Sequence, residues 1–200
     1  MIRHGVRAVL ARRDGKMKIL LASGSPRRKE LLANICPAFS VLVPTVDEAA
    51  IAAPYRGNPR RTVMALSRAK AQAARQMETA DAVIGADTVV ALGRTILGKP
   101  ENAEQALAML RSLSGRTHKV WTGVSVRFAK RTVTYAVCTR IRFYRLTDEQ
   151  IQTYVDSKEG MDKAGGYGIQ GRAGEFVKEI RKDYFNVVGL PLKRLARLLG

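Results

Sequence analysis

Short apolar runs that end at turn residues predict the strands of this 200-residue chain. The run at 18–22 stops at a Ser-Gly-Ser-Pro turn, and 39–43 stops at a proline. The small apolar run at 82–86 has the composition of a strand buried on both faces, and the extended pattern continues to residue 92. The stretches 118–128 and 132–144 are separated by three residues, which predicts an antiparallel hairpin.

Apolar residues at helical spacing predict the helices. Ser25 is a suitable N-cap and Pro26 suits the first helical position, so a helix is expected from there to a point before Pro37. Further helices are expected at 58–77, at 103–113, at 147–155 and after Pro191. Between Gly165 and Pro191, short strands with glycine-rich turns are expected.

Helices and strands mix without a strict βαβ rhythm, and a long hairpin interrupts them. This order predicts an α/β protein with a mixed sheet, bent around a groove. The chain contains no internal repeat and no linker rich in Gly, Pro or Ser, so residues 18–200 are expected to form a single domain.

The charge balance adds a constraint on partners. Thirty-five Lys and Arg against 17 Asp and Glu leave a formal charge of +18. Such a field attracts nucleic acid, anionic lipid or phosphorylated small molecules. The basic residues are spread along the chain, however, so many of them can simply be solvated surface residues. The charge therefore favours a phosphate-bearing partner without choosing one.

Several classes of protein are excluded by composition. No apolar run reaches the roughly 18 residues of a membrane span, so no membrane partner is expected. Cys36 and Cys138 lack the spacing of a metal site or a CxxC motif, which favours a reducing, cytoplasmic compartment. Residues 1–17 form a basic N-terminal extension, and its arginines keep a mitochondrial presequence open as a minor alternative.

The segment from Ser23 to Arg28 is the strongest local signal for chemistry. A helix start already favours an anion, and hydroxyls with guanidinium groups at the same corner match phosphate oxygens. The alternative is that Ser25 only caps the helix and both arginines are exposed.

Asp87 follows a buried strand directly, where open α/β folds place their ligands. It can hold Mg²⁺ or act as a general base on water, and Glu48 is a plausible partner carboxylate. The alternative is an aspartate that only ends a strand. Lys70 lies on an apolar helical stripe, so its side chain either extends out to solvent or points into a groove towards an anion.

The glycine-rich stretch 163–171 allows close approach of a ligand, but it is neither a Walker loop nor a dinucleotide-binding fingerprint. No hydrolase nucleophile elbow is present, and His118 is expected to be structural, although it can flank the groove.

The ordered set of segments resembles the Maf family of nucleoside triphosphate pyrophosphatases. The matching pieces are LASGSPRRKELL (21–32), VDE (46–48), SRAKA (67–71), IGADTVV (84–90), GKP (98–100), MLRSLSGRTHKV followed by TGV (109–124), KAGGYGIQG (163–171) and NVVGLPL (186–192). The resemblance covers residue 18 to the C-terminus.

The resemblance implies a mixed, strongly bent sheet flanked by helices, with two lobes around a deep nucleotide-binding groove, as in inosine-triphosphatase-like proteins. It also implies a homodimer and metal-dependent hydrolysis, with Mg²⁺ or Mn²⁺, of a nucleoside triphosphate to the monophosphate and pyrophosphate. Asp87 takes the catalytic position, and Glu48 and Asp87 the metal positions. The phosphate-binding positions fall on Ser23, Arg27, Arg28, Lys70 and Lys99.

Within the family, the KAG-Y-IQG pattern resembles the branch acting on dTTP and UTP. The positions linked to that choice are Arg27, Thr88 and Gln170. An amide such as Gln170 can donate to a carbonyl and accept from N3–H, which matches the edge shared by thymine and uracil.

The rival interpretation is a basic nucleic-acid-binding protein without catalysis, supported mainly by the charge. No RNA-recognition, KH, zinc-finger or helix-turn-helix signature supports it, and aromatic residues make up only 6% of the chain. A regulatory role in septum formation, historically linked to the family, is a third interpretation that keeps the same fold.

Overall fold

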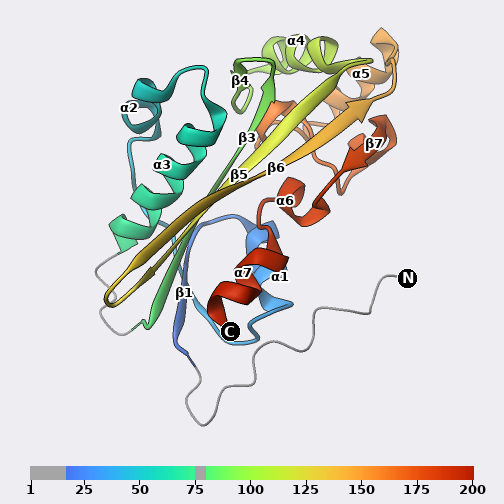
Figure 1. The fold of residues 1–200 in the computed structure, drawn as a ribbon. Helices are drawn as coiled ribbons and strands as arrows, with labels where there is room; N and C mark the ends of the chain where they lie inside the picture. Colours follow the sequence, from blue (N-terminus) through green and yellow to red (C-terminus); the bar gives the residue numbers. More distant parts are fainter. Residues whose placement is uncertain (1–16, 75–79) are drawn as a thin grey trace.

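A computed structural model describes residues 17–74 and 80–200 (Figure 1). Its strands form one seven-stranded sheet in the order β2-β1-β3-β5-β6-β7, with β4 paired to β3. The strands are β1 (Ile19–Ala22), β2 (Ser40–Leu42), β3 (Ala82–Leu92), β4 (Thr95–Leu97), β5 (Thr117–Phe128), β6 (Thr132–Phe143) and β7 (Val177–Arg181). Pairs β1–β2 and β1–β3 are parallel and the others antiparallel, which confirms the predicted mixed sheet.

Helices cover both faces of the sheet. They are α1 (Pro26–Ala33), α2 (Glu48–Ala52), α3 (Pro59–Ala73), α4 (Ala103–Leu113), α5 (Asp148–Asp156), α6 (Tyr184–Val188) and α7 (Leu192–Leu199), with 3-10 turns at Ala53–Tyr55, Ala164–Gly166 and Arg172–Phe176. In Figure 1, α2 and α3 lie on one side of the long strands, α1 and α7 on the other, and α4 and α5 near one end. No helix of the described residues is long and apolar enough to cross a membrane.

Two glycines let α3 lie directly on the sheet. A side-chain carbon at Gly85 of β3 would overlap the backbone at Ser67 and Ala71 of α3, and one at Gly123 of β5 would overlap Val63. The absence of side chains at these points therefore fixes the distance of α3 from β3. This packing determines which α3 side chains can reach the strand.

On the opposite face, two hydrophobic cores follow one another along the same strands. One joins α1 and α7 to the β3 and β5 segments that include Ala86 and Val124. The other joins α4 and α5 to the segments that include Val90 and Val120. These cores are the two lobes of the expected architecture, and buried polar residues of β3 and β5 lie between them.

A gap along one edge of β3 creates the opening between the lobes. Strand β1 pairs with Ala82–Gly85, and β4 pairs with Val90–Leu92. Because β5 occupies the other edge of β3, residues 86–89 have no strand neighbour among the described residues on the edge that β1 and β4 share. Asp87 and Thr88, which point to opposite faces of the strand, are both in this gap.

The structure corrects the sequence prediction in several places. Between Gly165 and Pro191 the chain contains mostly 3-10 turns and the short helix α6, with β7 as its one described strand, and the positive φ of Gly165, Gly166 and Gly189 places these glycines in turns. Helix α2 and strand β4 were not predicted. The predicted helix at 58–77 is observed as α3 up to Ala73, and residues 75–79 lie outside the described part of the chain. Almost all of the 1–17 extension lies outside it as well.

Candidate active site

One groove of about 1160 Å³ opens at the gap in β3. Every residue singled out from the sequence for phosphate, metal, catalysis or base selection lines it: Ser23, Arg27, Arg28, Glu48, Lys70, Asp87, Thr88, Lys99 and Gln170. These residues come from segments spread over nearly 150 positions, so the fold brings the separate motifs into one cavity. The lining also includes residues that sequence reasoning did not select, among them Glu159, Asp162 and Lys163.

On the α3 face of β3, a lysine bridges two carboxylates. Lys70 Nζ lies 2.7 Å from Asp87 Oδ1 and 2.7 Å from Glu48 Oε1. The Lys70 side chain is only 12% exposed, so it points into the groove and does not extend to solvent, which settles the question its sequence position raised. Glu48 begins α2 and its side chain is 58% exposed, whereas Asp87 is buried.

Burial is the main influence on the ionisation of Asp87. It raises the pKa of the carboxyl group above its ordinary value of 3.8, because the charged form loses solvation. The positive charges of Lys70 and Arg28 oppose this shift, and the negative charge of Glu48 adds to it. A carboxylate with a raised pKa is a better proton acceptor than an exposed one once it is ionised.

On the α1 face, the Ser-Gly-Ser-Pro turn places a second cation. Ser25 caps α1 by accepting a hydrogen bond from the Arg28 backbone, as predicted. The Arg28 guanidinium then donates to Ser23 Oγ at 3.2 Å, to Thr88 Oγ1 at 3.0 Å and to the Gly189 carbonyl at 3.0 Å. Arg28 therefore links the turn that contains Ser23 to β3 and to the segment that precedes α7.

Arg27 and Lys99 are the more accessible cations of the groove. Arg27 Nη1 lies 3.5 Å from Asp162 Oδ2, and the Arg27 side chain is 31% exposed. Lys99 follows β4, is exposed, and faces the same cavity. Both can move to meet a ligand, because neither is fixed by several internal hydrogen bonds of the kind that hold Arg28.

Gln170 is exposed on a loop that hydrogen bonds hold on both sides of it. The Gly168 amide donates to the Tyr154 hydroxyl at 3.0 Å, and that hydroxyl donates to Glu159 Oε1 at 3.4 Å. The other oxygen of Glu159 accepts from the Arg172 amide at 3.2 Å. Tyr154 and Glu159 thus fix the backbone that carries Gln170.

His118 supports the same loop from beneath. Its Nε2 lies 2.7 Å from the hydroxyl of Tyr167, which also lines the groove. Burial lowers the pKa of His118 to about 4, so the ring is neutral near pH 7. This agrees with the structural role expected from the sequence.

Comparison with known proteins gives the family of the chain. Residues 18–200 match the family described as "Maf-like protein". The chain belongs to the Maf family. A relative from Bacillus cereus, named "dTTP/UTP pyrophosphatase", is 48% identical over 182 residues, which is 91% of this chain and 94% of the relative. A relative from Bacillus mycoides with the same name shows the same identity and coverage.

The Maf chain also contains buried polar residues that sequence reasoning missed. Thr122 and Asn186 are both completely buried and hydrogen-bond to each other across 64 positions of sequence. Both occur inside segments that carried the family resemblance, TGV and NVVGLPL, which was the available signal. Their partners depend on strand register, and no spacing rule gives that register in advance.

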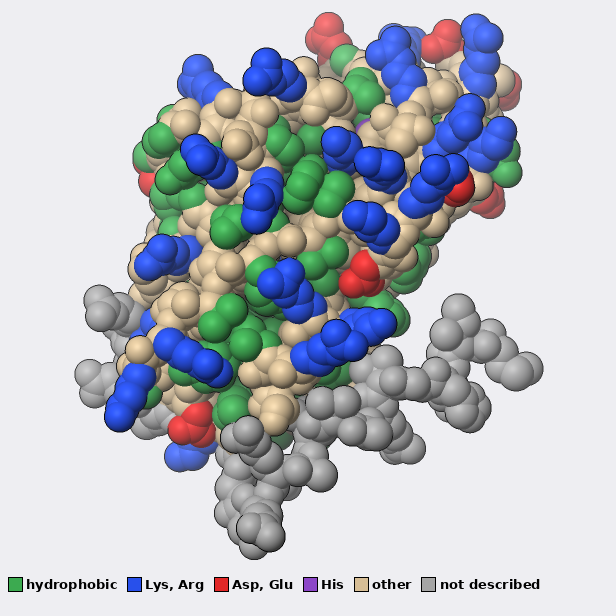
Figure 2. All heavy atoms as spheres, in the orientation of Figure 1, with side chains coloured by type: hydrophobic (Ala, Val, Ile, Leu, Met, Phe, Trp, Pro, Cys, Tyr) green, Lys and Arg blue, Asp and Glu red, His purple; other side chains and the backbone are tan. Residues whose placement is uncertain are grey.

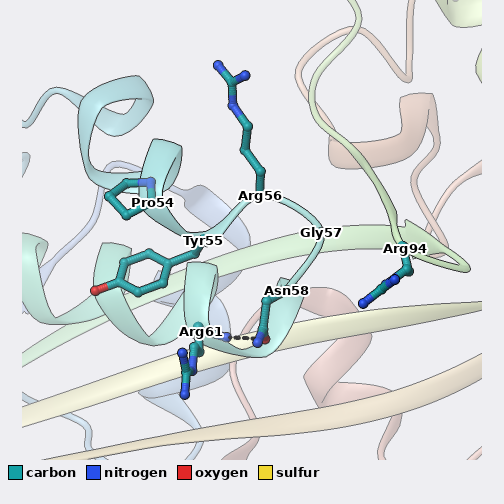
Figure 3. Close-up of a pocket in the computed structure, with 7 residues that line it drawn as sticks. All are labelled: Pro54, Tyr55, Arg56, Gly57, Asn58, Arg61 and Arg94. Atoms are coloured by element: carbon teal, nitrogen blue, oxygen red, sulfur yellow. Dashed lines mark hydrogen bonds between the residues drawn. The ribbon is translucent and has the colours of Figure 1, made fainter.

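A second, separate pocket of about 490 Å³ lies where α3 begins, near the β3–β4 turn. Arg56, Arg61 and Arg94 line it, but Figure 3 shows their guanidinium groups pointing in different directions. They do not converge on a point where one anion would contact all three. Basic side chains are similarly spread over the face of the Maf protein in Figure 2, with few acidic ones between them.

Proposed function

We propose that this Maf protein hydrolyses dTTP and UTP to the nucleoside monophosphate and pyrophosphate. Its membership of the family and its similarity to proteins named dTTP/UTP pyrophosphatase support the activity. The observation that carries the proposal is the groove itself, where one buried carboxylate, Asp87, lies among the cations Arg27, Arg28, Lys70 and Lys99. Such a cavity suits the polyanionic triphosphate of a nucleotide that must be attacked by water.

The role proposed for each groove residue follows from its exposure and its hydrogen bonds. Arg27 and Lys99, which are free to move, bind the terminal phosphates, and Ser23 with the α1 turn binds a phosphate at the fixed end. Lys70 and Arg28 offset the negative charge that develops at the α phosphorus. Asp87 orients the attacking water and takes its proton while the new P–O bond forms. The bond from the α phosphorus to the bridging oxygen breaks, and pyrophosphate leaves with that oxygen.

The donor set also fits a divalent cation. Glu48 and Asp87 already surround the positive charge of Lys70 Nζ at 2.7 Å each, so the two carboxylates are placed around a cation. Mg²⁺ and Mn²⁺ prefer oxygen ligands, so Glu48 and Asp87 would hold either ion. Such an ion would supply charge neutralisation and activation of water.

Base selection is proposed for Arg27, Thr88 and Gln170. The Gln170 amide can pair with the carbonyl and N3–H edge that thymine and uracil share, on the loop held by Tyr154 and Glu159. A base without that pattern would leave polar groups unpaired and would bind less well. We also propose a homodimer in the cytoplasm, where the free thiols of Cys36 and Cys138 stay reduced.

The test is pyrophosphate release from a panel of ordinary and modified nucleotides, each with Mg²⁺, with Mn²⁺ and with EDTA. Release from dTTP and UTP above the rest, lost with EDTA, is the expected result. No release from any nucleotide, together with RNA or DNA binding that weakens steeply with salt, would replace the proposal by the nucleic-acid-binding alternative. Sizing by light scattering checks the dimer.

A further inference from the structure

A row of buried hydroxyl and amide groups separates the two hydrophobic cores of the molecule. Thr88 Oγ1 lies 3.0 Å from Thr122 Oγ1, and Thr122 donates to the Asn186 carbonyl at 2.7 Å. The Asn186 side chain donates in turn to the Val120 carbonyl at 3.1 Å and to Thr139 Oγ1 at 3.0 Å. Thr88, at one end of this row, lines the groove, and so does Val120, whose carbonyl accepts from Asn186.

The directions of these hydrogen bonds follow from counting protons. A backbone carbonyl can only accept, so the single hydroxyl proton of Thr122 is committed to Asn186. Thr122 Oγ1 can therefore only accept from Thr88, and the proton of Thr88 points inward. Arg28 donates to one lone pair of Thr88 Oγ1. The remaining lone pair is all that Thr88 can offer to the groove.

Ser23 accepts a hydrogen bond from the same guanidinium, but it presents a donor to the groove where Thr88 presents an acceptor. Its oxygen accepts from Arg28 Nη1 at 3.2 Å and from the Ser25 amide at 3.3 Å. Among the described residues no acceptor takes the Ser23 proton, which leaves it as a donor. Ser23 therefore suits a phosphate oxygen, and Thr88 suits a group that carries a hydrogen.

We infer that Thr122 is a positioning residue that fixes Thr88 as a hydrogen-bond acceptor, so that the groove selects a substrate with a neutral N–H or O–H donor at that point. This deepens the proposed function and rests on it. In dTTP and UTP, the donor is either N3–H of the base or a sugar hydroxyl. Cytosine presents a lone pair at N3, and two facing lone pairs repel.

Thr122→Val tests the assignment because it keeps the shape of the side chain and removes the acceptor of the Thr88 proton. Thr88 can then turn its proton towards the ligand. Thr122→Ser keeps the hydroxyl and should behave like the wild type. Thr134→Val is the matched control, since Thr134 Oγ1 pairs with Ser125 Oγ at 2.9 Å, away from the row that ends at Thr88.

Two probes replace a donor by an acceptor: dCTP at base position 3, and 3′-fluoro-3′-deoxythymidine triphosphate on the sugar. The measurement is kcat/KM for dTTP divided by kcat/KM for each probe. In Thr122→Val, one of these ratios should fall roughly fivefold or more, and which ratio falls identifies the donor. Both ratios should stay at their wild-type values in Thr122→Ser and Thr134→Val.

Unchanged ratios for both probes in a folded Thr122→Val protein would overturn the inference while leaving the dTTP and UTP activity intact. If the wild type hydrolyses no nucleotide, the proposed function fails instead. The ratios are then taken from the binding affinities of the α,β-methylene analogues of dTTP and of the two probes. These affinities show without turnover whether Thr88 acts as an acceptor. An affinity ratio that is lower in Thr122→Val than in the wild type supports the inference. Ratios that are the same in both proteins contradict it.

Discussion

On the α3 face of β3, Asp87 and Lys70 meet as full charges, whereas on the α1 face Thr88 meets Arg28 and Thr122 through hydrogen bonds of fixed direction. The two residues are consecutive in the strand and open into one groove. Under the proposed function, Asp87 and Lys70 act at the phosphorus centre from the charged face, Arg28 supports them from the other face, and Thr88 discriminates between substrates. On this proposal, one stretch of β3 that is paired only with β5 supplies both reaction chemistry and selectivity, because alternate residues point to opposite faces.

Substitutions on the charged face should reduce activity more than substitutions on the hydrogen-bonded face, and Asp87→Asn should have the largest effect. The amide cannot accept a proton from water, so kcat should fall roughly 100- to 10,000-fold. Initial-rate measurements of pyrophosphate release check this. Near-normal turnover in a folded variant would remove Asp87 from the mechanism.

Lys70→Met should cost about 100-fold in kcat/KM, because it removes a cation that offsets developing charge. It should also move the acidic limb of the pH profile upward, since Lys70 opposes the rise in the pKa of Asp87. Lys29→Met on exposed α1 surface is the matched control. An unshifted limb would mean that Lys70 does not influence the catalytic carboxyl group.

The pH dependence of stability tests the ionisation of Asp87 on the charged face independently of activity. The pKa of Asp87 is higher in the folded protein than the ordinary 3.8, so its contribution to the free energy of unfolding is full below pH 3.8 and is lost as pH rises through the folded value. Asp87→Asn removes that loss, and its Tm at pH 7 should equal or exceed that of the wild type. Thermal unfolding across pH measures the difference, and a large fall in Tm at pH 7 would contradict it.

The hydrogen-bonded side should respond more weakly. Tyr154→Phe removes the hydroxyl that links the Gly168 amide to Glu159, so the Gln170 loop loosens. Each of the two hydrogen bonds lost is worth about 1 kcal/mol net, which predicts a rise in KM for dTTP of roughly fivefold or more, with little change in kcat. Tyr184→Phe, on an exposed tyrosine, serves as the control. A fall in kcat alone would show that the loop affects the chemical step.

Sequence alone predicted the elements with strong periodicity or clear caps. Helix α5 has the expected capping box, and the β5–β6 hairpin has its predicted three-residue connection. Helix α2 and strand β4 were missed because five and three residues are too short to show a period. The stretch after Gly165 was assigned to strands because its glycines do not reveal the sign of φ, which is positive at Gly165 and Gly166.

The sequence also predicted several charged residues of the groove, such as Arg28 and Asp87, but it did not single out Glu159, Asp162 or Lys163. Asp87 was expected at the end of a strand and lies inside β3 instead, because the strand continues to Leu92.

The position of Lys70 was ambiguous until Gly85 and Gly123 were seen to bring α3 down onto the sheet. The polarity of Thr88 depends on Thr122 and Asn186, which meet only in the folded register. Charged side chains can be identified from the sequence, whereas the direction of a hydrogen bond follows only from the tertiary structure.

Hydrolysis of dTTP in water enriched in ¹⁸O tests the central claim most directly, because it reports which phosphorus is attacked. Attack on the α phosphorus places the label in the monophosphate and leaves the pyrophosphate unlabelled, as mass spectrometry of both products would show. Label in pyrophosphate with an unlabelled monophosphate would mean attack on the β phosphorus and would contradict the account of Asp87 in this groove.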